Sequence, residues 1–225
     1  MWAIEDRFAG GRPAWEAGGA VFTDEVGRYE QMKVRLLNGT HSLIAYLGAL
    51  SGVGTIPEAI GLDGIESAAR AVLRDEYEPS IEVPSGVDIR AYESELFERW
   101  ANSALGHRTS QVGTDGSVKL RQRIPEPAML AIRNGGMPHL IALTVAGYLS
   151  CLAPLPGFDP GPHAAAMTDG ARERLAGYAA SARDGRELAQ RVIGELHLFG
   201  DELGSQDAVS YTHPDAADDL LCVDL

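Results

Sequence analysis

Cysteine and positive charge are both scarce in this chain. It has 2 cysteines among 225 residues, Cys151 and Cys222, and 32 acidic against 19 basic side chains give a net charge of −13. Cysteines so far apart provide neither a disulfide framework nor the ligand spacing of a zinc site, so a reducing cytoplasm and no metal site are expected. Binding to nucleic acid or an anionic membrane requires basic patches, so neither is an expected partner. An anionic substrate would need local cations, for which Lys33, Arg35 and Lys119 are available.

The sequence also lacks an apolar run long enough to cross a bilayer. Its longest apolar run, residues 140–153, is shorter than the ~20 residues that a membrane-spanning helix needs. Cys151 lies in this run and is expected to be a buried structural thiol. The first residues, MWAIEDRFAGG, show no basic segment followed by an apolar stretch, so no signal peptide is expected. With 45% hydrophobic residues, a globular protein with a substantial core is predicted.

Common nucleotide-binding and hydrolytic motifs are absent. No strand–GxGxxG–helix unit occurs, because the nearest glycine-rich string, residues 48–54, follows a helical pattern and has the wrong spacing. GxxxxGK[ST], HExxH and GxSxG are missing as well. An enzyme with its own complete nucleotide site is therefore hard to build from these residues.

Helical periodicity dominates the chain after residue 25 and predicts a mainly α fold. Four leucines recur at helical spacing and form the core stripe of a helix that starts near Asp24 and ends at Gly52 and Gly54: Leu36, Leu43, Leu47 and Leu50. Thr55 and Asp88 are typical N-caps for the helices that follow them. Further helices are expected over residues 63–77, 88–101, 125–132, 138–152, 168–183 and 184–198. Residues 1–23 are expected to be irregular or partly extended, and their aromatic side chains to pack on this chain or on something outside it.

The run MKVRLLNGTHS, residues 32–42, carries a candidate site. At roughly 100° per residue, Asn38 lies about 140° and His41 about 80° around the helix from Lys33, on one side beside the apolar stripe. An amine, a carboxamide and an imidazole placed in this way can grip and deprotonate a polyhydroxy substrate. The string Asn-Gly-Thr-His-Ser costs on the order of 2 kcal/mol in a helix, and such local costs are often found at functional sites. A solvated lysine, a core histidine and a helix break at Gly39 are the structural alternatives.

Residues 106–123 carry a second candidate. Gln111 and Lys119 flank Asp115-Gly116-Ser117, which is typical of a turn. One interpretation is a connection between helices with solvated charges. The other is a loop that presents amide and ammonium donors to the hydroxyls or the carboxylate of a substrate.

Both segments resemble the carboxy-terminal domain of the mannitol dehydrogenase family, the polyol-specific long-chain dehydrogenases and hexuronate reductases. Residues 33–48 fit the family string K-x-R-x-L-N-x-x-H-S-x-x-A-Y-L-G, and residues 4–16 resemble the segment that enters this domain. Residues 115–123 resemble D-G-S-x-K-L-P-Q-R, with Arg121 in place of the usual proline. The resemblance runs from about residue 2 to about residue 207. It implies a multi-helix substrate domain similar to the C-terminal fold of 6-phosphogluconate dehydrogenase.

The resemblance implies metal-independent hydride transfer between a nicotinamide cofactor, NAD or NADP, and a carbon of a sugar acid or polyol. It makes Lys33 the general base in alcohol oxidation and the general acid in ketone reduction. Asn38 and His41 then bind the reacting oxygen and neighbouring hydroxyls, and Gln111 and Lys119 bind the substrate. A lysine in water loses its proton only near pH 10, so burial against the cofactor would have to favour the neutral amine.

The family's cofactor-carrying Rossmann domain is absent from these residues, so they are expected to be inactive alone and to have their own N-terminal Rossmann domain as partner. D-mannonate and D-fructuronate are the favoured substrates, from the string over residues 4–20 and from Asn38-Gly39-Thr40-His41. Mannitol 2-dehydrogenase, acting on mannitol and fructose, is the runner-up. A non-catalytic helical domain that binds a partner or a sugar acid is the alternative from another class.

Three segments are expected along the chain. An entry arm covers residues 1–25, a helical mannitol dehydrogenase-type domain covers residues 26–207, and a tail covers residues 208–225. The tail resembles no part of the family and reads like translated sequencing-adapter sequence, with a genuine divergent tail as the alternative. It is expected to pack little, and no role is assigned to His213 or Cys222.

Overall fold

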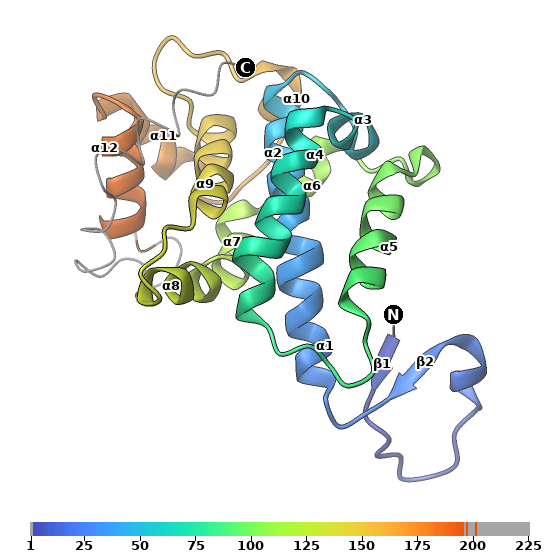
Figure 1. The fold of residues 1–225 in the computed structure, drawn as a ribbon. Helices are drawn as coiled ribbons and strands as arrows, with labels where there is room; N and C mark the ends of the chain where they lie inside the picture. The colour runs from blue at the N-terminus through green and yellow to red at the C-terminus, as the bar shows by residue number, and fades with distance from the viewer. Residues whose placement is uncertain (1, 196, 198–200, 202–225) are drawn as a thin grey trace.

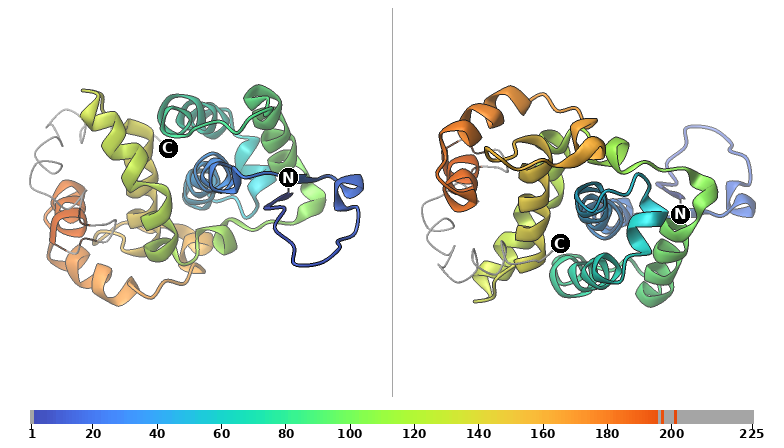
Figure 2. Two further views of the ribbon diagram at one scale, coloured as in Figure 1. Left: turned by 90° about the horizontal axis from the view of Figure 1, so that it is seen from below. Right: turned by 90° about the horizontal axis from the view of Figure 1, so that it is seen from above.

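The computed structural model describes residues 2–195, 197 and 201, which form a helical body around one long helix (Figure 1). This central helix, residues 26–50, consists of α1 (Val26–Met32), the π-helix η2 (Lys33–Gly39) and α2 (Thr40–Leu50). Seen end-on, it is surrounded by other helices (Figure 2). The mainly helical fold expected from the periodicity is therefore confirmed.

Helices also make up most of the other described residues. Those before residue 106 are α3 (Ile56–Ile60), α4 (Asp63–Ala71), η3 (Val72–Tyr77), η4 (Glu78–Ser80), α5 (Ile89–Ala101) and η5 (Ser103–Leu105). Those after it are α6 (Thr109–Gly113), α7 (Gly116–Arg123), α8 (Pro125–Arg133), α9 (His139–Leu152), α10 (Gly161–Ala165), α11 (Arg172–Ser181), α12 (Gly185–Gln190) and η6 (Arg191–Glu195). Helices α3, α4, α6 and α9 pack on α2. Among the residues described, no helix is both long and apolar enough to span a membrane.

Local sequence signals set two of the helix starts. The hydroxyl of Thr55 accepts a hydrogen bond from the backbone N–H of Glu58, and the Glu58 carboxylate accepts one from the backbone N–H of Thr55, which makes a capping box before α3. Asp88 accepts bonds from the N–H groups of Arg90 and Ala91 before α5. Caps of this kind contribute about 1 kcal/mol each, so the sequence alone locates these starts.

The apolar stripe of the central helix forms part of the core. Leu36 and Leu43 are fully buried, whereas Leu47 and Leu50 are partly buried and pack against the core from its edge. Cys151 on α9 is fully buried, and burial raises the pKa of its thiol to about 12. A protonated, enclosed thiol is the state expected of a structural cysteine.

Two close approaches fix how neighbouring helices meet the central one. A Cβ atom added at Gly39 would lie 2.6 Å from Cζ of Tyr77. A Cβ added at Gly116 would lie 2.4 Å from Cε2 of Tyr148 and 2.5 Å from Oη of Tyr46. Because interiors are close-packed, both positions require glycine for the adjacent rings to fit.

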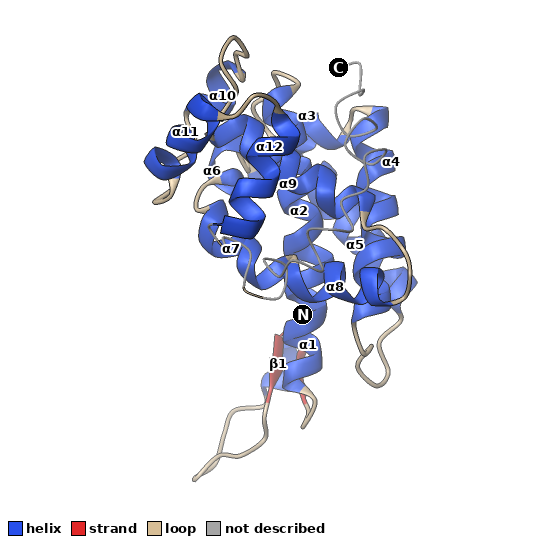
Figure 3. Ribbon diagram, turned by 90° about the vertical axis from the view of Figure 1, so that its left-hand side faces the viewer, coloured by secondary structure: helices blue, strands red, loops and turns tan. Residues whose placement is uncertain are grey.

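The entry arm forms a small unit at one end of the central helix and extends from the helical body (Figures 1 and 3). Strand β1 (Trp2–Ile4) pairs in parallel with β2 (Ala20–Phe22), and the 3-10 helix η1 (Trp15–Gly18) precedes β2. These two strands make the only sheet among the described residues, so that part of the chain contains no Rossmann-type sheet.

The aromatic side chains of the arm pack on one another. The ring centroid of Trp15 lies 5.8 Å from that of Trp2, 5.5 Å from that of Phe8 and 6.4 Å from that of Phe22. The guanidinium carbon of Arg12 lies 3.5 Å from the Phe22 ring centroid, a cation–π contact. Packing within the arm is only partial, because Trp2 and Phe8 are still 54% and 40% exposed.

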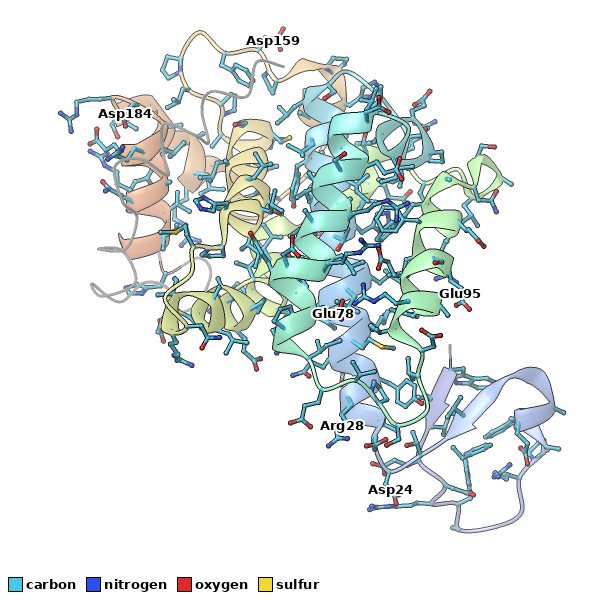
Figure 4. All side chains as sticks on the ribbon, in the orientation of Figure 1. Asp24, Arg28, Glu78, Glu95, Asp159 and Asp184 are labelled. Carbon is cyan, nitrogen blue, oxygen red and sulfur yellow. The ribbon has the colours of Figure 1, made fainter. Side chains whose placement is uncertain are left out.

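The start of α1 is tied to the loop that leads into α5. Nη2 of Arg28 lies 2.8 Å from Oε2 of Glu82, and Arg28 also pairs with Glu25. The carboxylate of Glu25 accepts a bond of 3.0 Å from the backbone N–H of Ser85. Figure 4 shows Arg28 and Asp24 at this end of the molecule, where the arm leaves the helical body.

The prediction of a loop over residues 106–123 is wrong. The segment forms α6 and α7, separated only by Thr114 and Asp115, and Asp115 has a left-handed φ of 56°. The start of α7 is capped from a distant part of the chain, because the backbone N–H of Ser117 donates to Asp169 over 2.8 Å. Such a long-range cap leaves no local signal. The predicted tail, residues 208–225, lies outside the described residues.

Replacing Gly39 with alanine is expected to destabilise the protein by about 1–3 kcal/mol, because the added methyl group overpacks against Tyr77. Gly27→Ala is the matched control in the same central helix, since a Cβ there meets nothing within 4 Å. It should be neutral or stabilise by up to about 1 kcal/mol. Chemical unfolding of both variants measures the difference. Equal stability of the two variants would show that the Tyr77 contact does not constrain the helix.

Candidate active site

The predicted trio lies where the central helix changes its hydrogen-bonding pattern. Lys33 begins the π-helix η2, Asn38 is its penultimate residue, and His41 is the second residue of α2. Backbone bonds of a π-helix run between residues five apart, so Lys33 and Asn38 stand on successive turns. The separation of about 140° predicted with α-helical geometry is therefore wrong here, and the two residues share a side more closely than expected. Single π-helical turns occur often at functional sites.

Lys33 is the open end of the trio. Its side chain is exposed, and no described residue forms a hydrogen bond or an ion pair with it. Asn38, one turn further along, is partly buried. The side-chain amide of Asn38 likewise has no hydrogen-bond partner in the described part of the chain. An accessible amine and an unused carboxamide next to it are available to a small polar ligand.

His41 is the enclosed end of the trio. Its Nε2 atom is buried and has no hydrogen-bond partner among the described residues. Burial, and then the charges of His107, Arg123 and Lys119, lower the pKa of His41 to about 3. The imidazole is therefore neutral at neutral pH, with one nitrogen that donates and one that accepts. Its ring centroid lies 6.0 Å from those of Trp100 and His107.

Lys119 and Gln111 lie on the two helices beside the central helix. The ammonium group of Lys119 donates to the carbonyl of Thr114 over 2.6 Å and to that of Val112 over 3.4 Å. Burial, together with the charge of Arg123, lowers the pKa of Lys119. Gln111 is exposed on α6. The structure therefore brings Lys119 into the surroundings of His41, whereas it shows no contact between Gln111 and the trio.

Sequence reasoning missed Arg123, at the end of α7. Its Nη1 donates to Oγ of Ser42 over 2.6 Å, and Ser42 donates to the backbone carbonyl of Asn38 over 3.1 Å. Burial lowers the pKa of Arg123. The sequence offered one indication of Arg123, its position as the last residue of the string DGSVKLRQR. The contact of this string with the central helix is visible only in the folded structure.

Arg35 is not part of the site, although the sequence offered it as a local cation. Its side chain is buried, and it donates to the backbone carbonyl of Ser80 and to the carboxylate of Glu126. Both partners lie on other elements, so Arg35 holds the central helix to η4 and α8. Within the described residues no group of three or more His, Cys, Asp or Glu side chains could hold a metal ion.

Three cations lie in or near the trio, namely Lys33, Lys119 and Arg123. Lys33 and Lys119 are the only lysines in the whole sequence, which carries a net charge of −13. With Arg123 they place positive charge beside a neutral imidazole and a carboxamide. Such a set can bind hydroxyl oxygens, stabilise a developing negative charge on oxygen, and move a proton at an exposed amine.

Residues 25–216 match the family model described as the mannitol dehydrogenase C-terminal domain. The chain belongs to this family. The matched range passes the domain end predicted at residue 207 and includes the first residues of the predicted tail.

Curated and solved relatives agree with this membership. The chain is 44% identical over 149 residues to D-mannonate oxidoreductase of Escherichia coli (strain K12), which covers 66% of this chain and 31% of that protein. It is 35% identical over 153 residues to mannitol dehydrogenase DSF1 of Saccharomyces cerevisiae, covering 68% of this chain and 30% of that one. The solved Pseudomonas fluorescens mannitol 2-dehydrogenase, a ternary complex with NAD and D-mannitol, has a TM-score of 0.78 at 28% identity and covers 97% of this chain. The chain spans 43% of that structure.

The low pKa of His41 predicts a pH dependence of stability. In the unfolded chain the imidazole takes up a proton near pH 6.5, whereas in the folded protein it does so only near pH 3. Between these values the unfolded state binds more protons, so this contribution lowers stability as pH falls, by up to about 1.4 kcal/mol per pH unit. Unfolding of the wild type and of His41→Gln from pH 7 to pH 3 measures it, and the wild type should lose stability relative to the variant. Parallel curves, or an imidazole NMR resonance of His41 that titrates near pH 6.5, would contradict the prediction.

Proposed function

We propose that these residues form the substrate side of an NAD- or NADP-dependent oxidoreductase that interconverts a secondary alcohol and a ketone on a sugar acid or polyol. The observation that carries the proposal is the exposed amine of Lys33 on a π-helical turn that leads to Asn38 and the neutral His41. The named relatives, which are oxidoreductases, support it.

Each member of the trio has a chemical role in this proposal. In alcohol oxidation the amine of Lys33 takes the hydroxyl proton, and in ketone reduction its ammonium group returns the proton to the oxygen. The carboxamide of Asn38 donates to the oxygen on which negative charge develops, and it does so without titrating. His41, neutral at the working pH, pairs its free nitrogen with the same oxygen or with a neighbouring hydroxyl once the side chains over it move aside. Lys119 and Gln111 bind the remainder of the substrate.

The described residues do not fit a nicotinamide dinucleotide by themselves. Their one sheet has 2 strands, and no glycine-rich turn leads from a strand into a helix N-terminus, the arrangement that binds the pyrophosphate in dinucleotide domains. The cofactor, which accepts or supplies the hydride when bound, would be held by chain outside the described residues. The exposure of Lys33 supports this proposal, because its amine is accessible to a cofactor held by another domain.

Within this reaction class we favour D-mannonate and D-fructuronate. The identity of 44% to a D-mannonate oxidoreductase, against 35% to a mannitol dehydrogenase, supports a sugar acid. Lys119, whose ammonium group is bound to carbonyls and to no described carboxylate, also suits the carboxylate of a substrate. Mannitol and fructose are the runner-up pair, supported by the fold of the solved complex with D-mannitol.

Lys33→Ala tests the proton-transfer role, in the polypeptide that joins this segment to a dinucleotide-binding domain. We expect kcat to fall by about 10²–10⁴-fold, the usual contribution of a general acid–base group, with the fold intact by circular dichroism. Arg174→Ala is the control, because Arg174 is an exposed cation on α11, away from the central helix. Unchanged turnover in Lys33→Ala would favour the non-catalytic binding domain.

The substrate is tested by comparing turnover of fructuronate and fructose with NADH and NADPH. We expect kcat/KM to be higher for fructuronate by at least 10-fold, a difference of about 1.4 kcal/mol in transition-state binding. A preference for fructose would select the mannitol pair instead. Residues 1–225 alone should reduce neither ketone, and steady turnover by this polypeptide would refute the need for a further domain.

A further inference from the structure

Arg123 carries a partly buried charge, and no carboxylate of the described residues forms an ion pair with it. Its hydrogen bond is the one to Oγ of Ser42, 2.6 Å long and linking residues 81 positions apart. The phenols of Tyr46 and Tyr77 favour its charge, but burial outweighs them and lowers the pKa of the guanidinium. The charge of Arg123 also acts on His41 and Lys119. A desolvated cation without a counter-ion is costly, and Arg123 therefore differs from Arg35, which is bound to a carboxylate.

The acceptor of this bond is itself part of the helix that carries the trio. The hydroxyl of Ser42 accepts from Arg123 and donates to the carbonyl of Asn38, four residues earlier, over 3.1 Å. A serine that bonds back to the carbonyl at i−4 competes with the backbone bond of the helix and bends it. Here the bond spans the junction at which η2 ends and α2 begins. The charge of Arg123 polarises the hydroxyl and so strengthens its bond to the Asn38 carbonyl.

We propose that Arg123 is a positioning residue for this reaction, which acts through Ser42 to fix the backbone of Asn38 and the start of α2 that carries His41. The inference rests on the proposed function and deepens it. The chain of bonds leads from α7 into the π-helical turn. Asn38 is the acceptor of Ser42's bond, and His41 lies within the turn that this bond spans. Arg123 itself needs no contact with the substrate.

Removing the bond should therefore affect turnover more than binding. In the polypeptide that includes a dinucleotide-binding domain, Arg123→Gln should lower kcat by about 100-fold, the usual effect of displacing a reacting group by about 1 Å. KM should change by less than 3-fold.

Arg123→Lys keeps the charge and a hydrogen-bond donor, and its kcat should be at least 10-fold higher than that of Arg123→Gln. Ser42→Ala should reproduce the loss, and the double variant Arg123→Gln with Ser42→Ala should be no slower than the slower single variant, because both remove the same chain of bonds.

Arg172→Gln is the matched control. Arg172 is also partly buried and donates to one acceptor, the carbonyl of Met167, over 2.6 Å, but it lies on α11 away from the trio. It should lose stability in chemical unfolding and keep its kcat. If Arg123→Gln does not fold, the smaller change Ser42→Ala decides the question by the same split between kcat and KM.

Three results would overturn the inference. Wild-type kcat in folded Arg123→Gln or Ser42→Ala would show that the bond does not position the trio. A large rise in KM with unchanged kcat would make Arg123 a substrate contact instead. If the losses of kcat in the two single variants multiply in the double variant, Arg123 and Ser42 act independently of each other. The proposed function fails separately: it is refuted if Lys33→Ala retains full turnover, whatever Arg123→Gln shows.

Discussion

The arrangement of the site depends on the contact between Gly39 and the ring of Tyr77, where no side chain can be accommodated. The contact lies at the end of the π-helical turn. Because Gly39 has no side chain, the ring of Tyr77, the last residue of η3, packs directly against the backbone of the central helix. The buried polar atoms without partners among the described residues are Oγ1 of Thr40, Nε2 of His41 and Oη of Tyr77. All three lie on or against this junction. Close packing and unsatisfied polar groups thus occur together, as is found where local rules are broken for function.

The distribution of positive charge sets this region apart from the rest of the helical body. Glu93 is only 3% exposed and forms ion pairs with three arginines from three elements, Arg70, Arg74 and Arg90. These charges therefore hold neighbouring helices together. Around His41 the cations Lys119 and Arg123 are bound to carbonyls and a hydroxyl rather than to carboxylates. The positive charge of these two side chains is therefore not neutralised by a bound carboxylate of the described residues, in contrast to the charge at Glu93.

Sequence predicted what depends on local pattern. The burial of Leu36 and Leu43 follows from helical spacing, and the helix starts at Thr55 and Asp88 follow from caps that bond within their own turn. The π-helical turn was not predictable, because it changes the register by one residue without changing the apolar pattern on either side.

Long-range contacts account for the other misses. Arg35 looked like a free cation because its acceptor, the carbonyl of Ser80, and its carboxylate, Glu126, come from other elements. Arg123 looked like a solvated charge because Ser42 is 81 residues away. The loop predicted around Gly116 is a helix start because Asp169 caps it from a distant segment. Each error has the same cause, since a polar side chain takes its role from an acceptor that only tertiary packing supplies.

The contrast between Lys33 and His41 explains why the proposed chemistry needs a second body. Both lie on the central helix, yet His41 is desolvated by its neighbours whereas Lys33 stays open to water. A proton-transferring lysine works near neutral pH only when its charged form is disfavoured, and burial is the main means of achieving that. The described residues bury His41 and leave Lys33 exposed to solvent. The partly exposed aromatic rings of the entry arm, at the same end of the central helix as α1, offer apolar surface for a body that covers Lys33. The division of the trio into an enclosed end at His41 and an open end at Lys33 therefore follows from burial alone, independently of any relative.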